Sequence, residues 1–80
     1  MTYIGIDTDT EGLKPVMSEL RCMQKMGIIG SIGEPEEYIF GGNKTGHYKI
    51  TILTDLSVEC LENHFYCTFN FQSDCYLIKE

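Results

Sequence analysis

Three cysteines and a histidine near the C-terminus are the side chains best suited to metal binding. Cys60, His64, Cys67 and Cys75 form a C-x3-H-x2-C-x7-C pattern. Zinc is bound by Cys and His, but structural zinc sites usually present two pairs of ligands, each pair two to four residues apart. Because the pattern does not show two such pairs, we expect no metal site and no cofactor.

The cysteines have a simpler interpretation. Cys67 alternates with Phe65 and Phe69, which is typical of one apolar face of a strand. Four cysteines would fit two disulfides in a secreted protein, but the chain shows no export signal, and cytosolic thiols stay reduced. We therefore interpret all four as small hydrophobic residues in or near the core, Cys22 included.

The two histidines, His47 and His64, are the candidates for a general base near neutral pH. A nucleophilic pair could be drawn between His64 and a nearby cysteine, but neither a local signature nor a third orienting group accompanies it. We expect structural or surface roles for both histidines, and a protein that is not an enzyme.

Acidic residues are the more informative set. Asp55, Glu59 and Glu62 are spaced i, i+4 and i+7, which would place three carboxylates along one side of a helix that follows Asp55. Neighbouring carboxylates would lie about 6 Å apart along the axis, at a rise of ~1.5 Å per residue. This spacing is comparable to the charge repeat along a nucleic-acid backbone.

A second acidic cluster lies in the middle of the chain. Glu34, Glu36 and Glu37 fall within a stretch between Lys25 and Lys44 that contains no basic residue. Each cluster alone could be a solvated face that keeps a small protein soluble. Together they indicate a surface that competes for a basic groove.

The net charge of the whole chain also indicates a basic partner. Twelve acidic residues against six basic ones give a formal net charge of −6 over 80 residues. Nucleic acid would repel such a chain, whereas basic surfaces of proteins that handle nucleic acid would attract it. No apolar stretch reaches the ~18 residues of a membrane span, and we expect a cytoplasmic protein without membrane contact.

The elements that position these residues follow from hydrophobic periodicity. Residues 2–7 alternate as a strand with Ile4 and Ile6 on one face. Asp, Thr, Asp and Thr at 7–10 then supply capping residues for a helix, which we expect to begin near Lys14 because Pro15 fits only a first turn. Gly27 should end this helix.

The remainder predicts four more strands and one short helix. Strands are expected at 28–32, 38–40 and 48–53, with a glycine-rich hairpin loop at 41–46. A short helix capped by Asp55 should follow, then strands at 65–71 and 75–78. The order β-α-β-β-β-α-β-β predicts a single α+β domain over residues 1–80, a two-layer sandwich of a mostly antiparallel sheet with helices on one face.

The first half of the chain contains IDTDTEGL at residues 6–13, a predicted helix after them, MGIIGSIG at residues 26–33 and IFGG at residues 39–42. With these segments it resembles the opening of tail-completion or neck proteins of long-tailed phages. In that family Ile39 would be Glu, and nothing after Gly42 matches the family's second half. The resemblance implies a phage or prophage origin and, in its plain form, a structural role in rings at the head–tail junction.

Two functions are therefore expected. The first is a non-enzymatic binding protein from a phage or mobile element, an anti-CRISPR or anti-defence inhibitor that occupies the basic groove of a host CRISPR effector or defence nuclease as a monomer or dimer. The second is a virion assembly component. The residues expected to contact the basic partner are the two acidic clusters and two apolar anchors: Asp55, Glu59, Glu62, Glu34, Glu36, Glu37, Tyr38 and Tyr66.

Overall fold

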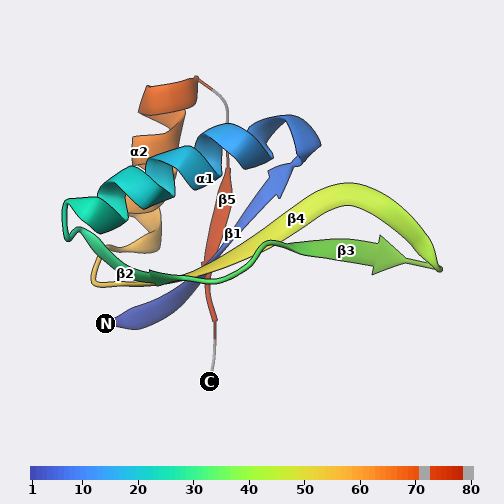
Figure 1. Ribbon diagram of the computed structural model, residues 1–80, viewed down its shortest axis with the longest axis horizontal. Coiled ribbons are helices and arrows are strands. Elements are labelled where there is room, and N and C mark those ends of the chain that lie inside the picture. Colours follow the sequence, from blue (N-terminus) through green and yellow to red (C-terminus); the bar gives the residue numbers. More distant parts are fainter. Residues whose placement is uncertain (71–72, 79–80) are drawn as a thin grey trace.

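The computed structural model describes residues 1–70 and 73–78 and has the predicted α+β fold, a five-stranded antiparallel sheet with two helices. The strands are β1 (Thr2–Asp9), β2 (Ile29–Ile32), β3 (Glu36–Phe40), β4 (Asn43–Thr54) and β5 (Asp74–Leu77). The helices are α1 (Thr10–Lys25) and α2 (Val58–Phe69). Both helices lie over the same side of the strands (Figure 1). Among the described residues no helix is long and apolar enough to cross a membrane.

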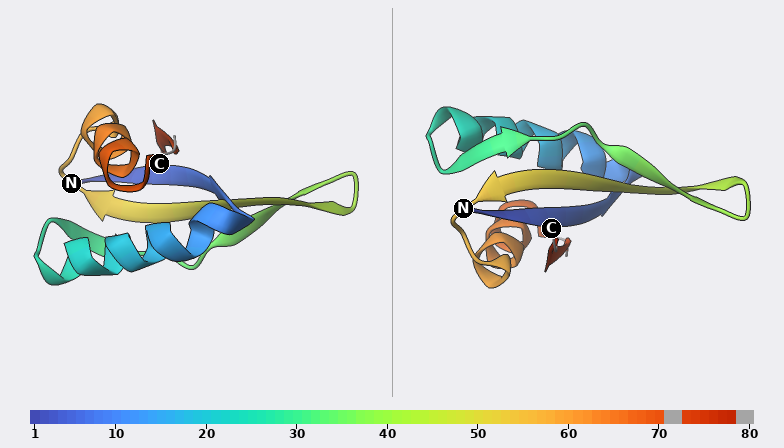
Figure 2. Two further views of the ribbon diagram at one scale, coloured as in Figure 1. Left: turned by 90° about the horizontal axis from the view of Figure 1, so that it is seen from above. Right: turned by 90° about the horizontal axis from the view of Figure 1, so that it is seen from below.

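The long strand β4 is the centre of the sheet. One of its edges pairs with β1 along the register Thr2↔Thr54 to Asp9↔His47, and β1 pairs in turn with β5. Its other edge pairs with β2 near Ile52 and with β3 near its start. The β3–β4 hairpin therefore extends beyond the part of the sheet that the helices cover (Figures 1 and 2).

The core follows from the alternation of apolar residues in β1 and β4. Ile4 pairs with Ile52 and Ile6 with Ile50, so these four side chains share the face under the helices, and none is exposed. The remaining buried apolar residues come mainly from one side of each helix, with one each from β2 and β5: Val16, Leu20, Met23, Leu61, Phe65, Ile29 and Cys75.

The first helix begins one turn earlier than the sequence predicts. The Asp9 side chain accepts a hydrogen bond from the backbone N–H of Gly12 at 2.8 Å, which caps the helix at Thr10. Pro15 consequently lies inside the helix, where its ring removes one backbone donor. The predicted end is confirmed: Gly27 has φ +77°, and its N–H and that of Ile28 bond back to carbonyls of the last turn.

The second helix replaces a predicted strand. Residues 65–69 continue α2 because Leu61, Phe65 and Phe69 recur every four residues and pack towards the sheet, so the strand predicted at 65–71 is wrong and the order has one strand fewer. Its last residue, Phe71, lies outside the described residues, as does Gln72 of the predicted turn. Asn70, with φ +58°, ends the helix.

The hairpin loop is also shorter than predicted. Its turn consists of Gly41 and Gly42, both with positive φ, as a two-residue turn between paired strands requires. β4 begins directly afterwards at Asn43, and it carries extra residues opposite Tyr38, with Gly46 at φ +74°. The irregularity therefore lies in β4, and β3 is a regular extended strand.

Candidate functional site

The face of the sheet opposite the helices carries a line of charged side chains across four strands. Asp74 of β5 pairs with Asp7 of β1, Asp7 pairs with Lys49 of β4, and Lys49 pairs with Glu36 of β3. Directly paired residues of antiparallel strands point to the same face. We call these four residues the carboxylate row. It holds three acidic side chains against one basic side chain.

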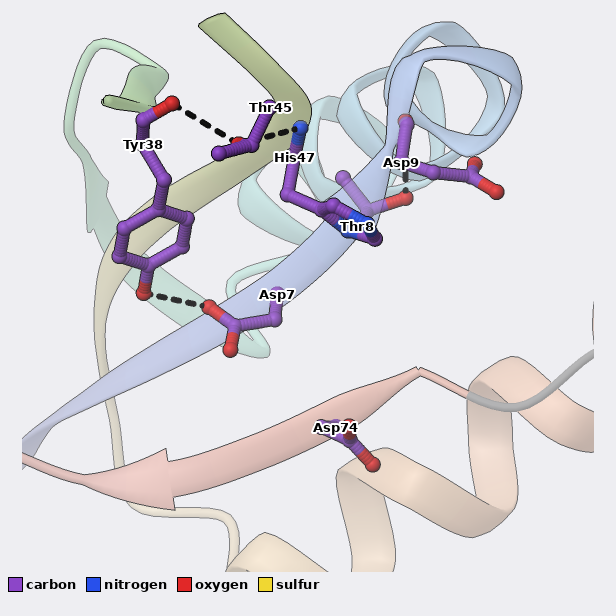
Figure 3. Close-up of a pocket in the computed structure, with 7 residues that line it drawn as sticks. All are labelled: Asp7, Thr8, Asp9, Tyr38, Thr45, His47 and Asp74. Atoms are coloured by element: carbon purple, nitrogen blue, oxygen red, sulfur yellow. Dashed lines mark hydrogen bonds between the residues drawn. The ribbon is translucent and has the colours of Figure 1, made fainter. Parts of the chain in front are cut away.

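Asp7 is the hydrogen-bonding centre of this face. Its carboxylate accepts a hydrogen bond from the Tyr38 hydroxyl at 2.8 Å and another from the Tyr76 hydroxyl at 3.3 Å, and the two hydroxyl oxygens lie 3.0 Å apart. Figure 3 shows the Tyr38 ring above the carboxylate of Asp7. Three strands that are distant in the sequence are thus joined through side chains.

The Tyr38 hydroxyl is held in its protonated form. The hydrogen bond with Tyr76, partial burial and the adjacent Asp7 carboxylate raise the pKa of Tyr38 well above its ordinary value. The hydroxyl therefore keeps its proton at neutral pH and remains a donor to Asp7. The arrangement fixes the positions of the three side chains.

The Tyr76 ring lies directly over Gly5. A Cβ atom at this glycine would come within 2.6 Å of the ring carbon that bears the hydroxyl. The absence of a side chain at Gly5 therefore allows the ring to pack closely against β1 and its hydroxyl to reach Asp7. The sequence places Gly5 and Asp7 on one face of the first strand, but it does not reveal that Tyr76 covers them.

A shallow depression of about 390 Å³ adjoins the carboxylate row. Thr45 connects its walls: the Thr45 hydroxyl donates to the Tyr38 carbonyl at 2.8 Å and accepts from the backbone N–H of His47 at 3.2 Å (Figure 3). No three Cys, His, Asp or Glu side chains among the described residues are placed to hold a metal ion. The residues that line the depression are Asp7, Thr8, Asp9, Tyr38, Thr45, His47 and Asp74.

The acidic cluster predicted along the second helix does not form one face. Asp55 precedes α2, whose cap is Ser57, and its carboxylate lies 3.1 Å from the N-terminal amine of Met1. Glu62 is half-buried and accepts a hydrogen bond from the backbone N–H of Cys75 in β5 at 3.1 Å. Glu59 alone of the three is an exposed carboxylate on the helix.

The second acidic cluster is divided between the two faces of the sheet. Glu36 belongs to the carboxylate row, whereas its neighbour Glu37 pairs with Tyr48 and points to the opposite face. Glu34 lies in the loop before β3 and lines a separate depression on the α1 side. Of the two predicted anchors, Tyr38 lies at the carboxylate row, and Tyr66 is exposed on α2.

The cysteines differ from their predicted roles. Cys75 is buried as expected, and burial, with the nearby Glu62 carboxylate, raises the pKa of its thiol to about 12. Cys22, Cys60 and Cys67 are exposed on the helices, so the prediction that they lie in or near the core is wrong. The cause is again the helix, which turns position 67 away from the apolar side of α2.

The two histidines lie in different places, His64 between the two helices and His47 beside the depression. His64 of α2 contacts Glu19 of α1, with 2.5 Å between the ring Nε2 and a carboxylate oxygen, so this pair joins the two helices. His47 lies in β4 at the edge of the depression.

Comparison of the chain with protein-family models, with curated proteins and with solved structures finds no match. The resemblance to phage tail-completion proteins stays a prediction from the sequence.

Proposed function

We propose that this chain is a non-enzymatic, stoichiometric inhibitor of a host protein that handles nucleic acid, for example a CRISPR effector or a defence nuclease. It acts by covering a basic groove of that protein. The carboxylate row is the observation that carries the proposal, because it brings acidic side chains from three strands onto one exposed face. Complementary charge speeds encounter with a basic surface and fixes the orientation of the complex.

The carboxylate row is a better contact surface than the acids near α2. Two of the three α2-side carboxylates already have partners within the chain, Asp55 at the N-terminal amine and Glu62 at β5. In the row, Asp74 and Glu36 are exposed, on β5 and β3, which are separated by the two strands β1 and β4. A sheet face that carries acids from several strands fits an extended groove.

Tyrosines supply the apolar part of this surface. Tyr3 and Tyr38 are each more than one-third exposed on the helix-free face, and Tyr76 lies half-buried between them. Tyrosine is enriched in protein interfaces, because a rigid ring provides contact area at low cost in conformational entropy. The hydrogen bonds to Asp7 hold two of these rings in place before binding.

The proposed setting is the cytoplasm of a bacterial host, with a phage or mobile element as the source. The support for this origin is the sequence resemblance described above, together with a net charge of −6. Enzymatic activity is not part of the proposal: the Tyr38 hydroxyl donates to Asp7, and the ring nitrogen of His64 is engaged with Glu19.

The proposal is tested by capture followed by displacement. The tagged chain is incubated with nuclease-treated bacterial lysate, and retained proteins are eluted with rising salt. The expected result is a protein that elutes with salt, binds labelled nucleic acid by itself, and releases it when one equivalent of the chain is added. Simultaneous binding of nucleic acid and chain to that protein would contradict the groove-covering mechanism.

Virion assembly is the second candidate. One specific observation favours it: Ile39 and Phe40 at the end of β3 are 65% and 82% exposed, as in a strand that contacts neighbouring subunits. Recovery of head or tail proteins, or of a self-assembled ring that resists salt, would support this function over the inhibitor.

A further inference from the structure

The outer strands of the sheet, β5, β2 and β3, differ in whether helix side chains form hydrogen bonds with their backbone groups. At β5, the Glu62 carboxylate of α2 accepts from the N–H of Cys75. At β2, the Gln24 amide of α1 donates to the carbonyl of Gly30 at 3.0 Å. Side chains that bind an edge in this way compete with the addition of another strand. We call these two edges closed, because a helix side chain binds one backbone group on each of them.

The outer edge of β3 is open. Within residues 1–70 and 73–78, no helix side chain bonds to the backbone of β3, and the hairpin lies beyond both helices (Figure 1). β3 is regular over all five residues, because the bulge that accommodates Gly46 lies in β4. A regular open edge is a template for pairing with another strand.

We propose that β3 pairs antiparallel with β3 of a second copy, which gives a two-fold dimer with a continuous sheet. Pairing all five residues places Tyr38 opposite Tyr38 of the other copy. Glu36 then faces Phe40, and Glu37 faces Ile39. No glutamate faces another glutamate, and the two most exposed apolar side chains of the hairpin gain a neighbour.

Charge complementarity selects a second copy as the occupant of this edge. Ile39 pairs with Lys44 inside each hairpin. In the dimer, Glu37 of one copy faces Ile39 of the other copy. It therefore lies in line with that copy's Lys44, on the same face of the sheet. The glutamate and the lysine are then two strand spacings apart, about 9.6 Å. The side chains of Glu37 and Lys44 are long enough to meet over Ile39. Because the dimer is two-fold symmetric, this ion pair occurs twice.

The two-fold dimer closes after two copies and does not form a ring. It keeps the helices of both copies on one side of the extended sheet and both carboxylate rows on the other. The dimer does not depend on what the carboxylate rows bind. The contact is small compared with the ~800 Å² per partner of a standard interface, so its dissociation should be readily measurable.

Sedimentation equilibrium over a concentration series tests the dimer. The mass should rise from 9.1 kDa towards twice that value as concentration increases. Ile39→Glu, which places a carboxylate opposite Glu37 of the other copy, should weaken the dimer at least tenfold, while Tyr66→Glu on exposed α2 should not change it. A constant monomer mass at millimolar concentration, or assembly beyond two copies, would overturn the proposal.

A charge exchange separates this contact from general effects on folding. Glu37→Lys alone should weaken the dimer, because two lysines then lie across the interface. The double variant E37K/K44E exchanges the two charges and should recover most of the lost affinity. Equal dimerisation of the single variant and wild type, or no recovery in the double variant, would exclude the proposed register.

Discussion

Apolar side chains are buried in the body of the sheet and exposed in the β3–β4 hairpin. Leu61 and Phe65 of α2 have no exposed surface, whereas Ile39 and Phe40 of β3 are 65% and 82% exposed. Helix side chains also bind the backbone of β2 and β5, and none binds β3 among the described residues. The body therefore carries the stability of the fold, and the hairpin and the helix-free face are free to contact other molecules.

The largest expected contrast is between two phenylalanines. Phe65→Ala should lower the free energy of unfolding by about 3–5 kcal/mol, because it leaves a cavity under α2. Phe40→Ala removes the same atoms from a solvated site and should change the free energy of unfolding by less than about 0.5 kcal/mol. Urea denaturation measures both. A loss of several kcal/mol for Phe40→Ala would mean that the hairpin is part of the core.

Gly5 tests the packing of the helix-free face. Gly5→Ala should lower the free energy of unfolding by about 1–3 kcal/mol, because the new methyl group collides with the Tyr76 ring. In a Tyr76→Ser background the same substitution should cost much less, since the ring is absent. Thermal denaturation of the two single variants and the double variant gives this coupling. Additive effects would show that the ring does not lie over Gly5.

Glu62 tests the closed edge at β5. Glu62→Ala should lower stability by about 1 kcal/mol and speed hydrogen exchange of the Cys75 amide, because that N–H loses its acceptor. Glu62→Gln keeps an acceptor oxygen and should have a smaller effect on both. Exchange of the Cys75 amide that is as slow in Glu62→Ala as in the wild type would contradict this role for the carboxylate.

The smallest expected effect is the difference between the exposed thiols and the buried thiol of Cys75. In the folded protein a thiol reagent near pH 8 should modify Cys22, Cys60 and Cys67 and leave Cys75 until the chain unfolds. The folded-state pKa of Cys75, about 12, lies above its ordinary 9.0, so the folded state retains this proton longer. Its contribution to stability is present below pH 9 and is lost as pH rises towards 12.

Cys75→Ala provides the control for that pH dependence. Its free energy of unfolding should fall less steeply between pH 9 and 12 than that of the wild type. Equal slopes in urea titrations of the two proteins would exclude a contribution from Cys75.

Local signals predict the first half of the fold. The alternation around Ile4 and Ile6 and the terminal Gly27 are decided within a few residues of the chain, whereas the expectation that Pro15 needs a first turn placed the start of α1 one turn too late. The end of α2 could not be predicted in this way. Phe65, Cys67 and Phe69 fit an alternating strand as well as Phe65 and Phe69 fit a helix, and the packing of Phe65 into the core decides between them.

The candidate site depends on strand register, which no local pattern specifies. Asp7 is 31 residues from Tyr38 and 69 from Tyr76, and the three meet only because β1 pairs with β4 and β5 in one register. Spacing along the chain places Glu36 and Glu37 together, whereas the strand separates them onto two faces. The same reasoning overlooked the internal partners of Asp55 and Glu62.

The most direct test of the proposed surface compares two double variants with the same net charge. Asp74→Lys with Glu36→Lys changes the carboxylate row, and Asp55→Lys with Glu59→Lys changes the acids near α2; each moves the formal charge from −6 to −2. Affinity for the captured nucleic-acid-binding protein is measured at low salt. We expect the first pair to weaken binding at least tenfold and the second to weaken it far less. Equal losses, or a larger loss for the second pair, would contradict the assignment of the carboxylate row.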